Sequence, residues 1–183
     1  MGEVMEYLDI VDEENNLLGR TESRDVIHKE GLWHREVAAW IMNENGKLLM
    51  ERRACTKKQE PNKWGLCAGH IDPGEDIKSS MVRELEEEIG LKIDVKDLKL
   101  ISIEKKQNSY GDIKNYNFQY NYFVRTNKKI EDYKVQLEEL SELKYISITR
   151  LEEIVKAKDE NYTFSDQLYM PKIIKILKGN KME

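Results

Sequence analysis

Residues 69–91 read GHIDPGEDIKSSMVRELEEEIGL, and this stretch decides the fold. Two glycines mark a loop, after which apolar side chains recur at every fourth position, as on the core-facing side of a helix. Asp76 is a typical N-cap, and Gly90 suits the left-handed conformation that ends many helices. The stretch therefore predicts a loop and then a helix whose core-facing residues are Ile77, Met81, Leu85 and Ile89.

Three glutamates of the same helix lie largely off this apolar stripe. Glu84, Glu87 and Glu88 are spaced i, i+3 and i+4, which makes them neighbours on a helix surface. Like charges at this spacing destabilise an isolated helix by about 0.2–0.5 kcal/mol per pair, and an acidic run is usually a solvated face. Beside a glycine loop, however, the three carboxylates suit a divalent cation, because Mg²⁺ takes oxygen ligands from carboxylates and from substrate phosphates.

The stretch also fits a longer pattern, G-x5-E-x7-R-E-U-x-E-E-x-G-U, in which U is a bulky aliphatic residue. The matching residues are Gly69, Glu75, Arg83, Glu84, Leu85, Glu87, Glu88, Gly90 and Leu91. This pattern resembles the signature of the Nudix hydrolases, and nine fixed positions in 23 residues make it a specific signal. The resemblance implies an α/β/α sandwich and a metal-dependent attack of water on a diphosphate linkage.

The resemblance also implies a role for each matched side chain. Glu75 and Arg83 would form the ion pair that holds the loop on the helix. The ligands of Mg²⁺ or Mn²⁺ would be Glu84, Glu87, Glu88 and the backbone carbonyl of Ala68. One of these glutamates, or one from a later loop, would help to deprotonate the attacking water. A metal ion fits this chemistry because it neutralises phosphate charge and lowers the pKa of its bound water.

Other segments resemble the Nudix branch related to type 1 isopentenyl-diphosphate isomerase: GLWHR at 31–35, LLMERRA at 48–54 and PNKWGLCAGHIDPGE at 61–75. In the isomerase a catalytic cysteine directly precedes Gly-His-Pro. This chain has Ala68 there, and Cys67 is one residue early, which on a strand faces the other side. The isomerase's catalytic glutamate falls near residues 116–118, which hold no acid. Hydrolysis is therefore favoured; isomerisation of isopentenyl diphosphate and a non-catalytic nucleotide sensor are the alternatives.

Strand-like and helical segments surround the loop and helix. An N-terminal hairpin is predicted from residues 6–12 and 17–20, and further strands at 37–43, 47–53, 64–68, 98–104, 115–125 and 143–148. Helices are predicted near 150–158 and from 161 onward, with apolar positions that include Leu168 and Ile173. Pro171 indicates a kink or a late start in the last helix. This order predicts the α/β class, as a sandwich with a mixed central sheet and residues 1–30 as a β extension.

Length and composition limit the class of protein. The 183 residues suffice for one domain over 1–183, and the net charge of −5 argues against a nucleic-acid surface without excluding a single nucleotide. No apolar run reaches the length of a membrane span, and the acidic N-terminus lacks the features of a secretory signal. Cys55 and Cys67 then predict reduced thiols in a cytoplasm. A homodimer is the common default for such a protein.

Residues near the loop are candidates for contact with a nucleoside di- or triphosphate, or with a nucleoside diphosphate joined to another group. Arg52, Arg53 and Lys57 form a basic cluster that could bind phosphates, although a solvated loop explains it equally well. Trp33, Trp64 and Tyr120 could stack on a base, although large aromatic side chains more often belong to the core. The candidates for an additional catalytic or metal-binding acid are Glu138, Glu139 and Glu142.

Two histidines lie near the same segments. His70 directly follows the first glycine of the loop, and structural and near-site roles are equally plausible for it. His34 suits a core position or a dimer contact as well as contact with substrate. Cys67 and His70 have the spacing of half a zinc site, but the sequence offers no second pair to complete it.

Overall fold

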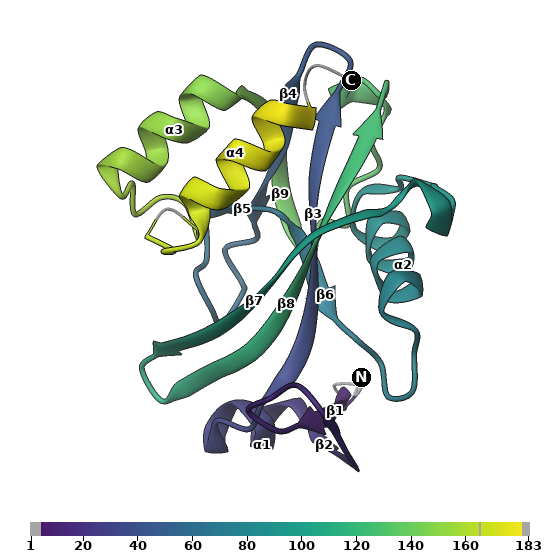
Figure 1. Ribbon diagram of the computed structural model, residues 1–183, viewed down its shortest axis with the longest axis vertical. Coiled ribbons are helices and arrows are strands. Elements are labelled where there is room, and N and C mark those ends of the chain that lie inside the picture. The colour runs from purple at the N-terminus through teal and green to yellow at the C-terminus, as the bar shows by residue number, and fades with distance from the viewer. Residues whose placement is uncertain (1–4, 165, 181–183) are drawn as a thin grey trace.

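The computed structural model describes residues 5–164 and 166–180. A seven-stranded mixed sheet lies at its centre; helix α2 covers one face, and helices α3 and α4 cover the other (Figure 1). This arrangement confirms the predicted α/β class and mixed central sheet. The strands are β1 (Tyr7–Val11), β2 (Leu17–Ser23), β3 (His34–Asn43), β4 (Lys47–Arg53), β5 (Trp64–Gly65), β6 (Cys67–His70), β7 (Lys99–Tyr110), β8 (Ile113–Thr126) and β9 (Leu140–Ser147). The helices are α1 (Arg24–Glu30), α2 (Ile77–Ile89), α3 (Ile148–Ala157) and α4 (Met170–Asn180), with 3-10 turns η1 (Val95–Asp97) and η2 (Ile130–Asp132).

Strand β3 organises the sheet because it has three partners. It pairs in parallel with β8 along its whole length, and β8 pairs with β7 as an antiparallel hairpin. On its other edge, β3 is in register with β4 only at Met42 and Leu48, beside their shared turn, and with β6 over residues 36–39. Strand β4 continues away from β3 and pairs with β5 and β9. The edge of β3 is thus divided between β4 and β6, which places β6 beneath α2.

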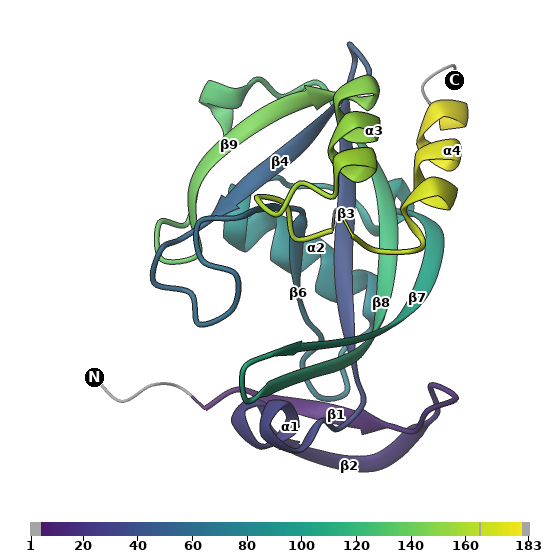
Figure 2. The ribbon, with the colours of Figure 1, turned by 90° about the vertical axis from the view of Figure 1, so that its left-hand side faces the viewer.

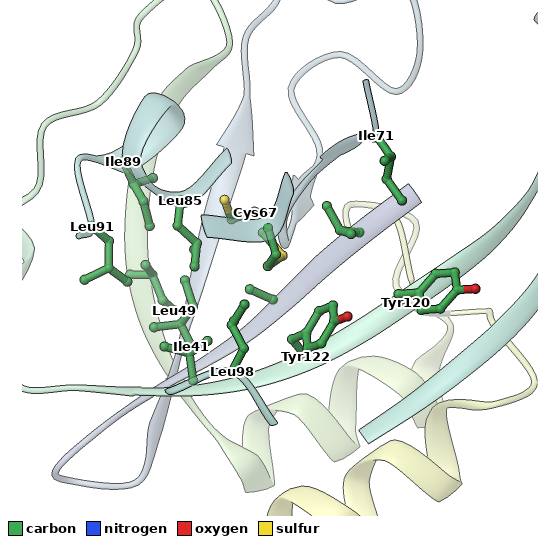
Figure 3. Close-up of a cluster of buried hydrophobic side chains, with 14 of the residues drawn as sticks. Ile41, Leu49, Cys67, Ile71, Leu85, Ile89, Leu91, Leu98, Tyr120 and Tyr122 are labelled. Carbon is green, nitrogen blue, oxygen red and sulfur yellow. The ribbon is translucent and has the colours of Figure 1, made fainter. Parts of the chain in front are cut away.

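Helix α2 has the ends and the core face that its sequence predicts. The Asp76 side chain accepts hydrogen bonds from the backbone N–H groups of Lys78 and Ser79, and Gly90 ends the helix with φ +62°. The side chains of Met81, Leu85 and Ile89 are fully buried, and they pack on a cluster with Leu49 of β4 and Tyr122 of β8 (Figure 3). Because this stripe holds α2 on the sheet, the acidic side of the helix is left for other contacts.

The opposite face of the sheet is covered by α3 and α4. Trp40 and Met50 of the sheet pack there against Leu151 of α3 and Ile173 of α4. The last helix begins only at Met170, so Pro171 lies in its first turn, where the missing N–H costs no helical hydrogen bond. The late start that Pro171 indicated is thus confirmed, whereas a helical pattern from residue 161 was wrong: residues 160–164 and 166–169 are not helical, and Leu168 is 98% exposed.

The N-terminal segment packs across one end of the sheet as a β1–β2 hairpin with helix α1 (Figure 2). The predicted hairpin is confirmed, but the assignment of residues 1–30 to β structure alone missed α1, and residues 1–4 lie outside the described part. This seven-residue helix has no side-chain cap bond at its start and is held by burial of Ile27 against Leu8 and Ile10. Among the described residues, no helix combines the length and apolarity needed to cross a bilayer.

Candidate active site

A cleft of about 300 Å³, within the size range of small-molecule sites, opens beside the loop that precedes α2. Helix α2 and strand β6 supply one part of its wall. Strands β7 and β8 supply another, together with Thr163, Phe164 and Tyr169. The N-terminal segment contributes Glu6 and Arg24. The cleft therefore lies where the divided edge of β3, the acidic helix and the N-terminal segment meet.

The three glutamates of α2 all line this cleft, next to Ala68 and Gly69 of β6. Glu88 is 7% exposed, and the side chains of Glu84 and Glu87 are 12% and 55% exposed, so the trio runs from the core to solvent. Glu84 lies directly over Gly69: a Cβ added to this glycine would come closer than 3.0 Å to the Glu84 carboxyl group. The missing side chain at residue 69 is what lets Glu84 approach the β6 backbone.

Arg83 ties the loop to the acidic helix through five hydrogen bonds. Its Nε and Nη2 donate to the two carboxylate oxygens of Glu75 at 3.1 and 3.0 Å, a forked pair that holds the loop. Its Nη1 donates to Glu84 Oε1 at 2.7 Å and to Glu87 Oε2 at 3.2 Å, and its Nη2 also donates to the carbonyl oxygen of His70 at 3.0 Å. One guanidinium thus orients two of the three glutamates and both ends of the loop.

The electrostatics of the trio suit a bound cation. Burial raises the pKa of Glu84 to about 7, although the charge of Arg83 opposes the shift. Burial likewise raises the pKa of Glu88 to about 8, and the neighbouring charge of Glu84 adds to it. Carboxylates that are hard to ionise next to one another become favourable ligands once a divalent ion neutralises them. The donor set therefore fits the metal ion that the sequence pattern implies, with Glu84, Glu87 and Glu88 as the side chains that would hold it.

A fourth acid, Glu51 of β4, lies behind the trio and was missed by sequence analysis. It is 3% exposed, and ligand atoms of Glu51, Cys67 and Glu88 all lie within 4.8 Å of one another. The Cys67 thiol donates to Glu88 Oε2 at 2.9 Å. The one available signal was an acid two residues after Leu49, on the same side of the strand and directly after the apolar run Leu48, Leu49 and Met50.

The predicted phosphate-binding cations and the extra acids separate into two groups. Arg53 and Lys57 line the cleft together with Glu139, which is ion-paired with Lys57. Arg52 instead pairs with Glu142 at 3.5 Å, and both side chains are about half exposed. Glu138 is exposed at the surface. Of the predicted residues, Arg53, Lys57 and Glu139 are therefore the ones that face the cleft, and Arg24 and Lys106 add two cations that the sequence did not indicate.

Three histidines from separate elements meet beside the cleft. Ligand nitrogens of His28, His34 and His70 lie within 4.8 Å of one another, and their Nε2 atoms have no hydrogen-bond partner among the described residues. Glu36 Oε1 lies 3.5 Å from the Nε2 of His70 and 3.8 Å from that of His34, and Glu6 Oε1 lies 2.9 Å from His70 Nδ1. Burial and the neighbouring imidazoles lower the pKa of His28 to about 3, which keeps it neutral. This donor set could also hold a divalent ion.

The aromatic residues named from sequence lie away from the cleft wall. Trp33 and Tyr120 are buried in the core cluster under α2, and Trp64 packs between the cations of Arg52 and Lys144. Aromatic side chains that do line the cleft are Tyr110, Phe164 and Tyr169. They sit at the end of β7 and in the turns before α4, two segments whose side-chain directions the sequence pattern does not reveal.

Comparison with known proteins agrees with this geometry. Residues 32–168 match the family model for the NUDIX domain. An uncharacterized Nudix hydrolase of Clostridium acetobutylicum is 36% identical over 150 residues, which cover 80% of this chain and 72% of the relative. Isopentenyl-diphosphate Delta-isomerase 2 of Photorhabdus laumondii is 27% identical over 159 residues, 86% of each chain.

Among solved structures, DR0079 of Deinococcus radiodurans has the same fold. Its crystal structure superposes with a TM-score of 0.66 at 22% identity, and the match covers 94% of this chain and 99% of that one. At this identity the likeness concerns the fold alone, whereas the domain match over residues 32–168 and the Clostridium relative concern the family. The chain belongs to the Nudix family, and it is a hydrolase that acts on pyrophosphate-containing substrates.

Proposed function

We propose that this protein uses Mg²⁺ or Mn²⁺ to cleave the diphosphate linkage of a nucleoside di- or triphosphate, or of a nucleoside diphosphate joined to another group. The observation that supports this most is the trio Glu84, Glu87 and Glu88, oriented by Arg83 and facing a cleft that also holds cations. A bound divalent ion would neutralise phosphate oxygens and acidify a water molecule.

The side chains of the cleft perform the remaining tasks. Arg53 and Lys57 offer positive charge to phosphate oxygens on the side of Glu139, and Arg24 and Lys106 offer it on the side of the N-terminal segment and β7. Glu139 is kept beside the cleft by its ion pair with Lys57. It is thus the candidate, from outside α2, for the carboxylate that accepts the proton of the attacking water.

The side chains that line the cleft suit a nucleotide. Tyr110, Phe164 and Tyr169 present aromatic surface to it, and aromatic rings stack on bases. The Tyr169 hydroxyl donates to Gln119 Oε1 at 3.2 Å, which holds its ring in place. The combination of acids, cations and aromatic rings in one cleft suits a ligand with a metal-bound diphosphate and a base.

The test is a panel of nucleoside diphosphates, triphosphates and diphosphate conjugates incubated with the protein and Mg²⁺, with products scored by chromatography. Against the best substrate, Glu87→Gln should lower kcat by about a hundredfold or more with an unchanged circular dichroism spectrum, because the loss of a metal ligand removes charge stabilisation in the transition state. Glu86→Gln is the matched control, since Glu86 lies on the same helix and pairs with Lys92 at the surface. A Glu87→Gln enzyme with near-normal turnover would disprove the assignment.

Isomerisation of isopentenyl diphosphate is the second candidate, and the named relative from Photorhabdus laumondii favours it. The cleft argues against it, because Ala68 is the residue exposed there, whereas the Cys67 thiol is buried behind Glu88. The protein should leave isopentenyl diphosphate unchanged in a nuclear magnetic resonance assay of double-bond migration. Migration that Cys67→Ala abolishes, and that survives Glu87→Gln, would reverse this order.

A non-catalytic nucleotide sensor would bind the same ligands with metal but would release no product over hours. The panel therefore also separates this function from hydrolysis. We place the protein in the cytoplasm, which agrees with Cys55 and Cys67 being free thiols. Fractionation of the source cells is the direct measurement.

A further inference from the structure

The side chain of Glu51 is placed where its strand otherwise buries apolar groups. Glu51 follows Leu49 by two residues on β4, so both point to the face covered by α2. Its carboxylate is 3% exposed, and its Oε2 atom has no hydrogen-bond partner in the part of the chain that the structure describes. Leaving a buried acceptor unsatisfied costs about 1–3 kcal/mol, and more if the group is charged.

Most of the groups around Glu51 increase this cost, and the positive charge of Arg53 relieves it only in part. Its neighbours in the buried cluster are a second carboxylate, Glu88, and the thiol of Cys67, which donates to Glu88 and not to Glu51. The Arg53 side chain donates its Nε to the carbonyl oxygen of Gln59, and Lys57 is ion-paired with Glu139. Two acids and a thiol therefore face one another at the inner end of the site without a described cation between them.

A divalent cation resolves this arrangement. We propose that Glu51 is an inner ligand of the divalent-cation site, and that Glu51, Glu88 and Cys67 form a carboxylate–thiol pocket that binds thiophilic ions as well as Mn²⁺. The proposal rests on the proposed function, because Glu88 belongs both to this inner pocket and to the trio that lines the cleft. An ion held by Glu88 would thus have ligands on both sides: Glu84 and Glu87 toward the cleft, and Glu51 toward the core.

The chemistry of the three ligands determines which ions the inner pocket prefers. Carboxylate oxygens suit Mg²⁺ and Mn²⁺, whereas a thiolate suits Zn²⁺ and Cd²⁺. Burial raises the pKa of Cys67, so the metal-free thiol keeps its proton. Binding of Cd²⁺ releases this proton to solvent as the Cd–S bond forms, together with any proton held by the two carboxyls. With Mg²⁺, which prefers oxygen ligands, the sulfur contributes little to binding.

The first test measures Mn²⁺ affinity by electron paramagnetic resonance on the full-length protein. Glu51→Gln keeps the shape of the side chain and removes its charge, and it should weaken Mn²⁺ binding by about tenfold or more. Glu86→Gln, at the exposed position on α2, should bind Mn²⁺ as the wild type does. Wild-type affinity in Glu51→Gln overturns the proposal and leaves a buried acid that only shares a proton with Glu88.

The second test follows sulfur ligation and does not depend on turnover. Titration with Cd²⁺ should give a thiolate-to-metal absorption band in the ultraviolet that Cys67→Ser abolishes and Cys55→Ser retains, because Cys55 is exposed and Cys67 is buried. The absence of this band in the wild type, or its survival in Cys67→Ser, overturns the proposed pocket. The Cd²⁺ titration also tests the inner pocket if Glu51→Gln fails to fold.

The two proposals fail in distinguishable ways. If the wild type binds no Mn²⁺, both the proposed function and the inner pocket are wrong. Suppose instead that Glu87→Gln loses Mn²⁺, that Glu51→Gln binds Mn²⁺ with wild-type affinity, and that the wild type gives no thiolate band with Cd²⁺. In that case only the inner pocket is wrong.

Discussion

Gly69→Ala tests the contact between β6 and α2 with a single methyl group. Gly69 is not among the described glycines with positive φ, so its backbone accepts alanine. The new Cβ would come closer than 3.0 Å to the carboxyl group of Glu84, a separation that real Cβ contacts essentially never show. The Glu84 carboxyl group therefore has to move by about 1 Å, and its 2.7 Å hydrogen bond with Arg83 has to lengthen or break.

The expected effects on catalysis and on stability differ in size. Misplacing a catalytic group by about 1 Å can cost about a hundredfold in rate, which corresponds to about 2.7 kcal/mol of transition-state stabilisation. The free energy of unfolding should fall by only about 1 kcal/mol, because Arg83 keeps its forked pair with Glu75 and the displaced carboxylate can turn toward the cleft. Gly69→Ala should thus remain folded while losing most of its turnover.

The measurements are kcat on the best substrate of the panel, Mn²⁺ affinity by electron paramagnetic resonance, and thermal unfolding by circular dichroism. Gly179→Ala is the matched control, because its added Cβ meets no atom within 4 Å and lies in α4, away from the cleft. A Gly69→Ala protein with wild-type kcat and wild-type Mn²⁺ affinity would refute the view that Glu84 has to lie against β6.

Three further outcomes are expected. Arg83→Lys keeps the charge but loses the fork to Glu75, so Mn²⁺ should bind several-fold more weakly and the free energy of unfolding should drop by about 1–2 kcal/mol in urea titrations; unchanged values would contradict the role of Arg83. In the folded protein the pKa is raised from 4.5 to about 7 for Glu84 and to about 8 for Glu88. As the pH rises, the unfolded chain therefore releases these protons first, and the free energy of unfolding of the metal-free protein should decline between pH 4.5 and 8. Scanning calorimetry should then show a larger increase of Tm with Mn²⁺ at pH 8 than at pH 6, and an equal increase would count against these shifts. Gly90→Ala should cost about 1–2 kcal/mol in urea unfolding because residue 90 has φ +62° and an added Cβ would press on Lys134 at 3.0 Å; a neutral result would show that the helix end adapts.

Helix α2 could be predicted because its signals are local. The cap at Asp76, the fourfold apolar spacing and Gly90 all lie within 15 residues, and each acts through hydrogen bonds or burial of the helix itself. The spacing of Glu84, Glu87 and Glu88 on one helix face follows from the same geometry. The central sheet was likewise predictable in class, because its strands carry apolar runs that turns separate.

The rest of the site depends on contacts between distant segments, which no spacing in the sequence encodes. Glu51 meets Cys67 and Glu88 only because β4 and β6 both pair with the same edge of β3. His28 joins His34 and His70 through α1, a short helix stabilised by burial of Ile27 and without a side-chain cap at its start. Leu168 shows the reverse error, since an apolar residue assigned to the last helix together with Ile173 lies before that helix and faces solvent.

The distribution of cleft residues over the chain has a practical consequence for redesign. The acids of the proposed metal site belong to α2 and β4, whereas the aromatic rings are Tyr110 of β7 and Phe164 and Tyr169, which precede α4. Replacing Tyr110 or Tyr169 should therefore change substrate preference while the proposed metal ligands keep their own scaffold. A library aimed at new substrates is best confined to these ring positions, where diversity carries the least risk to the reaction itself.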